Sequence, residues 1–382
     1  MQKRLVAILS LIALAIALPM CSAASDQPWT TARTNEWYAQ QPWLIGSNFI
    51  PSTAINQLEM WQADTFDLPT IDRELGWAES LGMNTMRVFL HNLLWQQDSA
   101  GFLKRMDQFL AVADKHHIRI MFVLLDSVWD PHPHLGKQPE PRPHVHNSGW
   151  VQAPGADVLK DASSWDRELK PYIVGVLTHF RDDKRIVIWD LMNEPDNDTA
   201  QYKQEVPNRA QVALRLLKEE WKWARSVKPS QPLTSGVWKG DWSDAGLSEM
   251  ARFQLENSDV ITFHCYDPPD VMKKRIESLR RFRRPIICTE YMARPLGSTF
   301  ASVLPLLKQE GVGAYNWGFV SGKTQTIYSW DSWEKSYSGE PPVWFHDIFR
   351  KDGTPYDPRE TELIEHLTQS APASRGNAAN TD

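Results

Sequence analysis

Two kinds of segment alternate along the chain from about residue 43 to the C-terminus. The first kind is a short run rich in Ile, Val, Leu and Phe, which is typical of strands buried on both faces of a parallel sheet. The pattern predicts eight such strands, at Leu44–Ile50, Thr85–Leu90, Ile118–Leu125, Ile186–Met192, Leu233–Val237, Val260–His264, Ile286–Thr289 and Val312–Trp317.

The second kind of segment is longer and has the periodicity of an amphipathic helix. Several of these segments begin at residues that can cap a helix. They predict helices at Thr70–Leu81, Phe102–His116, Ser164–Phe180, Arg209–Val227, Asp270–Arg284 and Thr299–Gln309, with a weaker candidate at Asp244–Glu256.

A strand followed by a helix, repeated eight times, is the pattern of a (β/α)₈ or TIM barrel of the α/β class. A doubly wound open sheet has a similar alternation, but no glycine-rich phosphate loop follows the first strand. We therefore expect one barrel domain over residues 25–369. Two long loops, Asp126–Lys160 and Trp317–Tyr356, follow the third and eighth strands and belong to the rim where barrel active sites are built. The small polar residues 370–382 predict a disordered tail.

The N-terminus has the features of an export signal. Lys3 and Arg4 precede the apolar run Leu5–Leu18, which is shorter than the roughly 20 residues of a membrane span. Small residues at Cys21–Ala24 offer a cleavage site. We expect residues 1–24 to be a signal peptide and the mature protein to be periplasmic or secreted. A lipid anchor at Cys21 is the alternative.

Composition adds two expectations about partners. The net charge of −6 comes without long runs of one sign, which argues against nucleic acid as a partner. Eighteen Trp residues are an unusually high number. Aromatic faces stack on sugar rings, so this number favours a carbohydrate substrate, although a Trp-rich core is the alternative. We expect a monomer without a membrane span.

Two glutamates follow directly on predicted strands. Glu194 ends the segment Trp189–Pro195 on the fourth strand, and Glu290 lies near the end of Pro285–Tyr291 on the seventh. A carboxylate at the carboxyl end of a barrel strand is placed for catalysis. A surface or helix-capping Glu is the alternative for either residue alone, but two of them across one barrel mouth indicate a shared site.

Two neighbouring carboxylates cannot both ionise easily, so one of them keeps its proton. The protonated group can then donate to a glycosidic oxygen while the ionised group attacks the anomeric carbon. A separation of about 5–5.5 Å predicts retention of configuration, and one of about 6.5–9.5 Å predicts inversion. Sequence alone leaves this choice and the order of the two roles open.

Several strand ends together resemble the cellulase-type family 5 of glycoside hydrolases and its clan of retaining barrels. The resemblance rests on Asn193-Glu194-Pro195, Glu290, Arg87 and His264-Cys265-Tyr266, and it covers roughly residues 40 to 365 as strand order. It implies a retaining O-glycosyl hydrolase that cleaves plant-type poly- or oligosaccharides through a covalent intermediate and that uses no cofactor.

The resemblance also implies roles for individual residues. Glu194 would be the acid/base and Glu290 the nucleophile. Asn193 would bind the sugar 2-hydroxyl, Arg87 would keep Glu290 ionised, and Tyr266 would donate to Glu290. His264 would line the cleft near Glu194, and Trp317 would be a platform under the sugar.

One position departs from the family pattern. Where such enzymes often carry a His after the third strand, this chain has Asp126, which would contact the sugar hydroxyls instead. This difference leaves the ring type of the sugar open. An exo-acting, arabinofuranosidase-like enzyme with the same two glutamates is therefore an alternative, and a non-catalytic carbohydrate-binding barrel or a transglycosylase is a further one.

Histidines and cysteines suggest two other kinds of site. His132, His134, His144 and His146 could bind zinc, but no ordered ligand spacing supports this, and we expect no metal. For the cysteines, strand alternation predicts that Cys265 faces the helices, whereas Cys288 shares the inward face of Glu290. Both thiols should therefore be free.

Overall fold

The computed structural model describes residues 27–243 and 245–370. The predicted signal peptide with Cys21, and all of the predicted tail beyond residue 370, lie outside the described residues. Within the part that is described, no helix has the length and hydropathy needed to cross a membrane.

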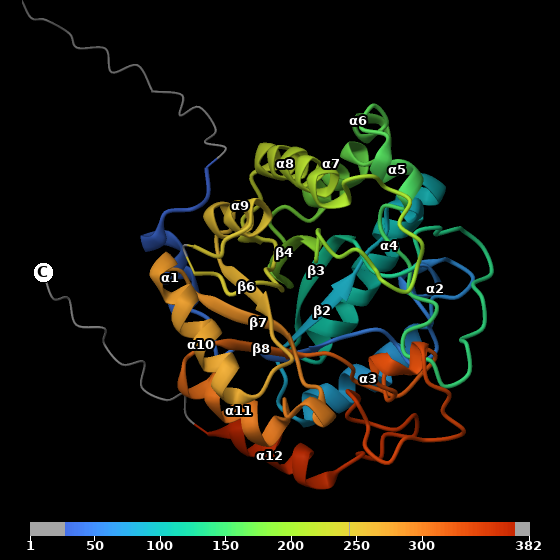
Figure 1. Ribbon diagram of the computed structural model, residues 1–382, viewed down its shortest axis with the longest axis vertical. Helices are drawn as coiled ribbons and strands as arrows, with labels where there is room; N and C mark the ends of the chain where they lie inside the picture. The colour runs from blue at the N-terminus through green and yellow to red at the C-terminus, as the bar shows by residue number, and fades with distance from the viewer. Residues whose placement is uncertain (1–26, 244, 371–382) are drawn as a thin grey trace, which may run out of the picture.

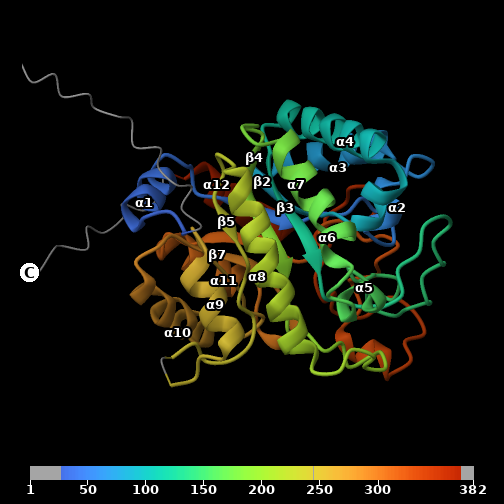
Figure 2. The same ribbon diagram turned by 90° about the horizontal axis from the view of Figure 1, so that it is seen from above.

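Eight parallel strands form the centre of the molecule, and the helices lie around them (Figures 1 and 2). Their order in the sheet is β5-β4-β3-β2-β1-β8-β7-β6, so sequential strands are neighbours and the first strand pairs with the last. This is the predicted (β/α)₈ barrel. The strands are β1 Ile45–Asn48, β2 Thr85–Phe89, β3 Arg119–Asp126, β4 Ile186–Asn193, β5 Leu233–Thr234, β6 Ile261–His264, β7 Ile286–Tyr291 and β8 Gly313–Asn316.

The barrel closes between β5 and β6 through a few single contacts rather than a regular ladder. Val237 forms an isolated parallel bridge with Phe263, and its N–H donates to the carbonyl of Thr262 at 3.0 Å. The predicted strand Leu233–Val237 is thus a two-residue strand followed by one bridge.

Every predicted helix is present, and two of them differ most from their predicted extent. Helix α4 begins at Asn92, ten residues before the predicted start, and non-helical backbone at Asp98 interrupts its periodicity. The predicted helix Ser164–Phe180 is divided into α6 and α7, because Pro171 in the first turn of α7 has no N–H to continue the hydrogen bonding of α6. The helices between strands are α3 Leu68–Ser80, α4 Asn92–Lys115, α6 Trp165–Glu168, α7 Lys170–His179, α8 Arg209–Val227, α9 Glu249–Asn257, α10 Pro269–Leu279 and α11 Phe300–Gln309.

Four further helices were not predicted because they are short or lie outside the strand–helix alternation: α1 Thr31–Ala39, α2 Gln57–Trp61, α5 Ala156–Lys160 and α12 Pro358–Gln369. Helix α1 lies at the amino-terminal end of the barrel. The side chain of Tyr38 packs there on a buried cluster that includes Met121, Ile188 and Ile287 from inside the barrel. Because this end is closed, a site must lie at the carboxyl-terminal end of the strands.

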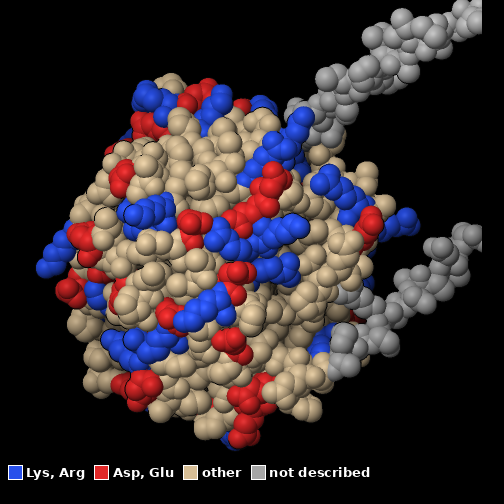
Figure 3. Space-filling view, turned by 180° about the vertical axis from the view of Figure 1, so that it is seen from behind, with Lys and Arg blue, Asp and Glu red and all other residues tan. Residues whose placement is uncertain are grey.

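Two long loops occur where the sequence predicts them. Residues 127–155 connect β3 to α5, and residues 317–357 connect β8 to α12. Both leave the carboxyl-terminal end of the barrel. On the face seen from behind the view of Figure 1, basic and acidic side chains are interspersed, and neither sign forms a large area of its own (Figure 3).

Candidate active site

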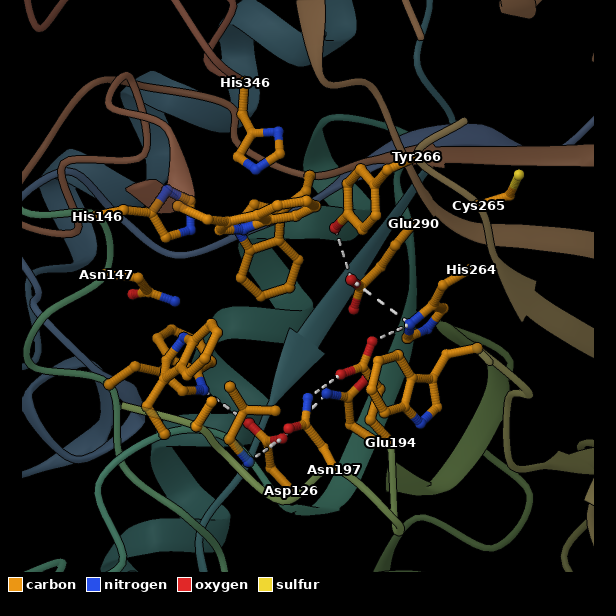
Figure 4. A pocket seen from close by; sticks show the side chains of 18 of the residues that line it. Asp126, His146, Asn147, Glu194, Asn197, His264, Cys265, Tyr266, Glu290 and His346 are labelled. Carbon is orange, nitrogen blue, oxygen red and sulfur yellow. Dashed lines mark hydrogen bonds and ion pairs between the residues drawn. The ribbon is translucent and has the colours of Figure 1, made fainter. Parts of the chain in front are cut away.

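Glu194 and Glu290 lie next to each other at the carboxyl-terminal mouth of the barrel (Figure 4). Both are buried, with 8% and 5% of their surface exposed. A carboxylate oxygen of each and a ring nitrogen of His264 all lie within 4.8 Å of one another. This upper limit on the distance between the oxygens is below the separation of about 6.5–9.5 Å that accompanies inversion, and it suits the shorter one, about 5–5.5 Å, that accompanies retention.

The backbone around each glutamate is irregular. Glu194 follows β4 directly and has a φ of +42°, in the left-handed region that a residue with a side chain rarely adopts. On β7, the register shifts against both neighbouring strands near Glu290. These irregularities turn both carboxylates into the mouth.

The bulge on β7 overturns the predicted orientation of Cys288. Cys288 does not share the inward face of Glu290. It lies in the same hydrophobic cluster as Cys265, together with Phe263 and Ala314. The period of two is broken between residues 288 and 290, so strand alternation does not carry across it. Both thiols are free, as predicted, and burial raises the pKa of Cys265 to about 11.

Arg87, on β2, is fully buried and connects Glu290 to the wall of the barrel. Its Nη1 donates to Glu290 Oε1 at 2.9 Å and to Asn48 Oδ1 at 2.8 Å. Its Nη2 donates to Asp190 Oδ2 at 2.8 Å and to Asn193 Oδ1 at 2.7 Å. Since the guanidinium remains charged at all ordinary pH values, it is a fixed cation beside Glu290.

Tyr266 holds the other oxygen of Glu290. Its hydroxyl donates to Glu290 Oε2 at 2.7 Å. Burial, together with the nearby carboxyl of Glu194, raises the pKa of Glu290 above its ordinary value. His264, the charge of Arg87 and the hydrogen bond from Tyr266 oppose that rise. The contacts with Arg87 and Tyr266 thus favour the carboxylate form of Glu290.

Glu194 contacts Asn197 and shares His264 with Glu290, whose Oε2 lies 3.5 Å from Nδ1 of His264. The amide of Asn197 donates to Glu194 Oε2 at 2.7 Å, and Nδ1 of His264 lies 2.7 Å from Glu194 Oε1. Burial lowers the pKa of His264 to about 4, so this imidazole is neutral near pH 7. Burial also raises the pKa of Glu194 to about 7. Glu194 is thus protonated over a range in which an ordinary glutamate is ionised.

Asn193 and Asp126 form the next layer of the site. The amide nitrogen of Asn193 donates to Asp126 Oδ1 at 3.0 Å, and the indole of Trp150 donates to Asp126 Oδ2 at 2.6 Å. Burial raises the pKa of Asp126 to about 7. Asp126 therefore orients Asn193 and Trp150, and its predicted contact with the sugar stays a prediction.

The glutamates open into a cavity of about 500 Å³. Seven of the eight predicted site residues line it, whereas Arg87 lies behind Glu290. Trp317 is partly exposed, and its ring packs edge-on against Phe89 and Trp150 at centroid distances of 5.7 and 5.8 Å. The other tryptophans in the lining are Trp129, Trp150, Trp238 and Trp330.

Sequence reasoning missed several residues of this site. Asp190 could have been found from the sequence, because it is a charged residue in the same apolar strand as Asn193, β4. In the structure, both residues bind the guanidinium of Arg87. Asn197 comes three residues after Glu194, in a loop without a period that could orient it. Asn147 and His346 lie in the two long loops, and nothing local in the sequence places them in the cavity.

The four histidines of the first long loop each bind a residue other than a histidine. His132 lies 3.0 Å from Glu205, and Nδ1 of His134 lies 3.2 Å from the carbonyl of Leu135. Nδ1 of His144 and of His146 bind the hydroxyl and the carbonyl of a single residue, Tyr328.

A metal ion would find its ligands elsewhere. In the described ranges, the group of side chains close enough to share an ion is Glu194, His264 and Glu290. The cation of Arg87 already touches Glu290 there, which disfavours a second positive charge.

Comparison with known proteins gives a family and a set of folds. Residues 78–319, more than half of the chain, match the family model described as cellulase, glycosyl hydrolase family 5. No curated protein sequence matches the chain.

Solved structures with a similar fold include three glycoside hydrolases. The endo-1,4-β-mannanase from Rhizomucor miehei is 15% identical, with a TM-score of 0.55 over 86% of this chain and 95% of that one. The endo-β-1,4-mannanase from Thermotoga petrophila is 16% identical, with a TM-score of 0.54 over 87% and 77%. GH5_18 from Streptomyces cattleya, in complex with GlcNAc, is 11% identical, with a TM-score of 0.54 over 86% and 81%. At these identities the likeness establishes the barrel fold.

Proposed function

The chain belongs to glycosyl hydrolase family 5, the cellulase family, and is a glycoside hydrolase; from this premise we propose that it retains configuration, with Glu290 as nucleophile and Glu194 as acid and base. One observation carries the proposal. Two buried carboxylates lie side by side, and the cation and the tyrosine hydroxyl both contact Glu290.

In the first step, Glu194 gives its proton to the glycosidic oxygen, and the bond from that oxygen to the anomeric carbon breaks. Glu290 attacks the same carbon from the opposite face and forms a glycosyl ester. In the second step, Glu194, now ionised, takes a proton from water. The hydroxide attacks the anomeric carbon and Glu290 leaves, so the two inversions restore the original configuration.

The surroundings of Glu290 suit this exchange of charge. Arg87 and Tyr266 stabilise the carboxylate before attack and again when it departs. They are held in place by other contacts, because Arg87 also binds Asp190 and Asn193. A preorganised cation does not have to be recruited during the reaction.

The surroundings of Glu194 suit a group that gives and takes a proton. The neighbouring His264 is neutral near pH 7, so it adds no cation that would strip the proton from Glu194. A general acid works best with a pKa near the working pH, and burial raises that of Glu194 to about 7.

Two residues are proposed to hold the reacting sugar. An amide nitrogen has two N–H groups. Asp126 takes one from Asn193, which leaves the other for the sugar 2-hydroxyl. Trp317 supplies an apolar face at the mouth of the barrel, where a sugar ring can stack.

The substrate class follows from the family and from the described neighbours, among which are β-mannanases. We propose an O-glycosidic bond in a plant-type oligo- or polysaccharide, and we expect the working protein to be exported. A furanoside is the second candidate, because Asp126 stands where family members often carry a His. A screen of p-nitrophenyl pyranosides and furanosides, beside xylan, glucan, mannan and arabinan, separates these candidates.

The test of the mechanism is the anomeric configuration of the first product. NMR of the reaction with the best glycoside from the screen should show the substrate's own anomer forming first. Formation of the opposite anomer would refute retention. A non-catalytic carbohydrate-binding barrel would release nothing from any glycoside, and a transglycosylase would give transfer products at high concentration of a sugar acceptor.

A further inference from the structure

The two long loops are joined to each other beside the active site. The backbone N–H of Asn147 donates to the carbonyl of Thr324 at 2.7 Å, and the N–H of His146 donates to Ser332 Oγ at 2.9 Å. In return, the indole of Trp333 donates to the carbonyl of His146 at 2.9 Å. Bonds run in both directions between the loops, so together they form one wall, which we call the loop wall (residues 142–150 and 324–346).

Two polar side chains of the loop wall each have one atom without a hydrogen-bond partner in the part of the chain that is described. Asn147 is 1% exposed, and its side-chain oxygen accepts no hydrogen bond. His346 is fully buried, and its Nε2 is also unpartnered. Both residues line the cavity, and Figure 4 shows them around it. An unsatisfied buried polar group costs about 1–3 kcal/mol. Two such groups, in side chains that line one cavity, favour a polar ligand there.

The tautomer of His346 is set by its other nitrogen. Nδ1 binds the backbone carbonyl of Met292, so Nδ1 carries the hydrogen and Nε2 has a free lone pair. Burial lowers the pKa of His346 well below its ordinary value, which keeps the ring neutral. The free Nε2 and the Asn147 oxygen are both acceptors, and they match the hydroxyl groups of a sugar.

The loop wall lies on the nucleophile's side of the cavity. The ring of His346 is 5.5 Å from that of Tyr266, which binds Glu290. Figure 4 shows His346 beside Tyr266, and His146 and Asn147 across the cavity from both glutamates. The leaving group must be next to the acid that protonates it, so the side with the loop wall receives the sugar that becomes attached to Glu290.

The cavity is open to solvent beyond the ends of β4 and β6. Its lining there includes Asp198 and Ala200 after β4 and Asp267 after β6, which are exposed. A long leaving group can extend from this side into solvent. On the other side, the loop wall leaves no such path past Asn147, which is buried.

On the basis of the proposed function, we infer that the enzyme is exo-acting: it releases the sugar at the non-reducing end, and Asn147 and His346 bind the hydroxyls of that terminal sugar. An internal sugar of a polymer would have to continue through the loop wall. The ligand class is therefore a terminal glycosyl unit with free hydroxyls opposite its anomeric carbon.

The first experiment follows the products of the wild-type enzyme. Oligosaccharides of the preferred sugar, labelled at the reducing end, are digested and the labelled fragments are separated over time. Exo-action shortens the labelled chain by one sugar at a time. Labelled fragments from the middle of the chain at the earliest times would overturn the inference, while the two-glutamate mechanism would stand.

The second experiment removes the two acceptors. Asn147→Gly deletes the amide and keeps the backbone at its φ of +51°, which glycine tolerates. His346→Asn keeps an N–H for Met292 and removes Nε2. Each change should lower kcat/KM for a p-nitrophenyl glycoside about tenfold, as expected for one lost hydrogen bond. His134→Ala, an exposed histidine of the same loop, is the matched control and should have no effect.

A deoxy substrate separates a binding role from a structural one. An aryl glycoside that lacks the hydroxyl opposite the anomeric carbon should react about tenfold more slowly with the wild type. In the variant that has lost the partner of this hydroxyl, the deoxy substrate and the parent glycoside should react at the same rate. Equal losses in wild type and both variants would overturn the assignment. Loss of all activity in Glu290→Ala, with no effect of the loop variants, would support the proposed function and refute the inference.

Discussion

Glu290 and Glu194 are the same kind of side chain, both are buried, and they end strands on opposite sides of one barrel mouth, yet their neighbours differ in charge. Glu290 touches the guanidinium of Arg87 and the hydroxyl of Tyr266. Glu194 touches a neutral imidazole and an amide, from His264 and Asn197. Burial raises the pKa of both, and the charge of Arg87 opposes both rises, but Arg87 contacts only Glu290 of the two directly.

The difference shows how one barrel mouth makes two roles from one residue type. Burial alone would protonate both carboxyls, and then neither could attack. A cation in contact with one of them restores its charge, while the other keeps a proton. The predictions below alter one side of this pair at a time.

Removal of the nucleophile should have the largest effect. Glu290→Ala should lower kcat on aryl glycosides by on the order of 10⁴-fold or more, because no other group can form the ester. Steady-state assays measure this loss, and circular dichroism checks the fold. Glu256→Ala, an exposed glutamate of α9, is the control and should be fully active. Activity of Glu290→Ala within tenfold of the wild type would contradict the assignment.

Removal of the acid should have an effect that depends on the leaving group. Glu194→Ala should lower the rate by about 10²- to 10⁴-fold for natural glycosides, whose leaving alcohols need a proton. For dinitrophenyl glycosides, whose leaving groups need none, the first step should be far less affected, and added azide should speed the second. A uniform loss across leaving groups would show that Glu194 is not the acid.

Removal of the Arg87 cation should make the pKa of Glu290 more like that of Glu194. Arg87→Met should raise the pKa of Glu290, so activity at acid pH should be lost at a pH about 1–3 units higher than in the wild type. The variant also leaves Asp190 and Glu290 buried without their partner, which should lower the free energy of unfolding by about 3–5 kcal/mol. A pH–rate profile and urea unfolding measure the two effects. An unchanged acid limb would show that Arg87 does not keep Glu290 ionised.

Removal of an amide should have the smallest effect, on the other limb of the profile. Asn197 donates to Glu194 and so stabilises its charged form. The wild type should lose kcat/KM as the pH rises through about 7, where Glu194 loses its proton. In Asn197→Ala, Glu194 should hold its proton more strongly, and this limb should move up by about one pH unit. A shift to lower pH would show that the amide binds the protonated form.

The strand ends of the site were predictable from the sequence because each follows directly on a buried apolar run. Glu194 and Glu290 are at or beside such ends, whereas Arg87 lies in the middle of β2, and the barrel order brings the three together. The orientation of Cys288 was not predictable, since a bulge on β7 breaks the alternation between it and Glu290.

The residues of the two long loops could not be predicted as site residues from the sequence, for a different reason. Asn147 and His346 are far apart in the sequence and meet only because the two long loops bind each other. No periodicity orients a side chain in such a loop. His146 shows the consequence: its sequence context left open what it binds, and its Nδ1 binds the backbone of the other loop.

The central claim is that Glu290 carries the sugar and Glu194 does not. An activated 2-deoxy-2-fluoro glycoside of the preferred sugar slows the second step, so the intermediate accumulates and can be digested and mapped by mass spectrometry. The account predicts one added fluorosugar, on the peptide that contains Glu290 and at that residue. A label on Glu194, or complete turnover of an active enzyme without any label, would contradict it.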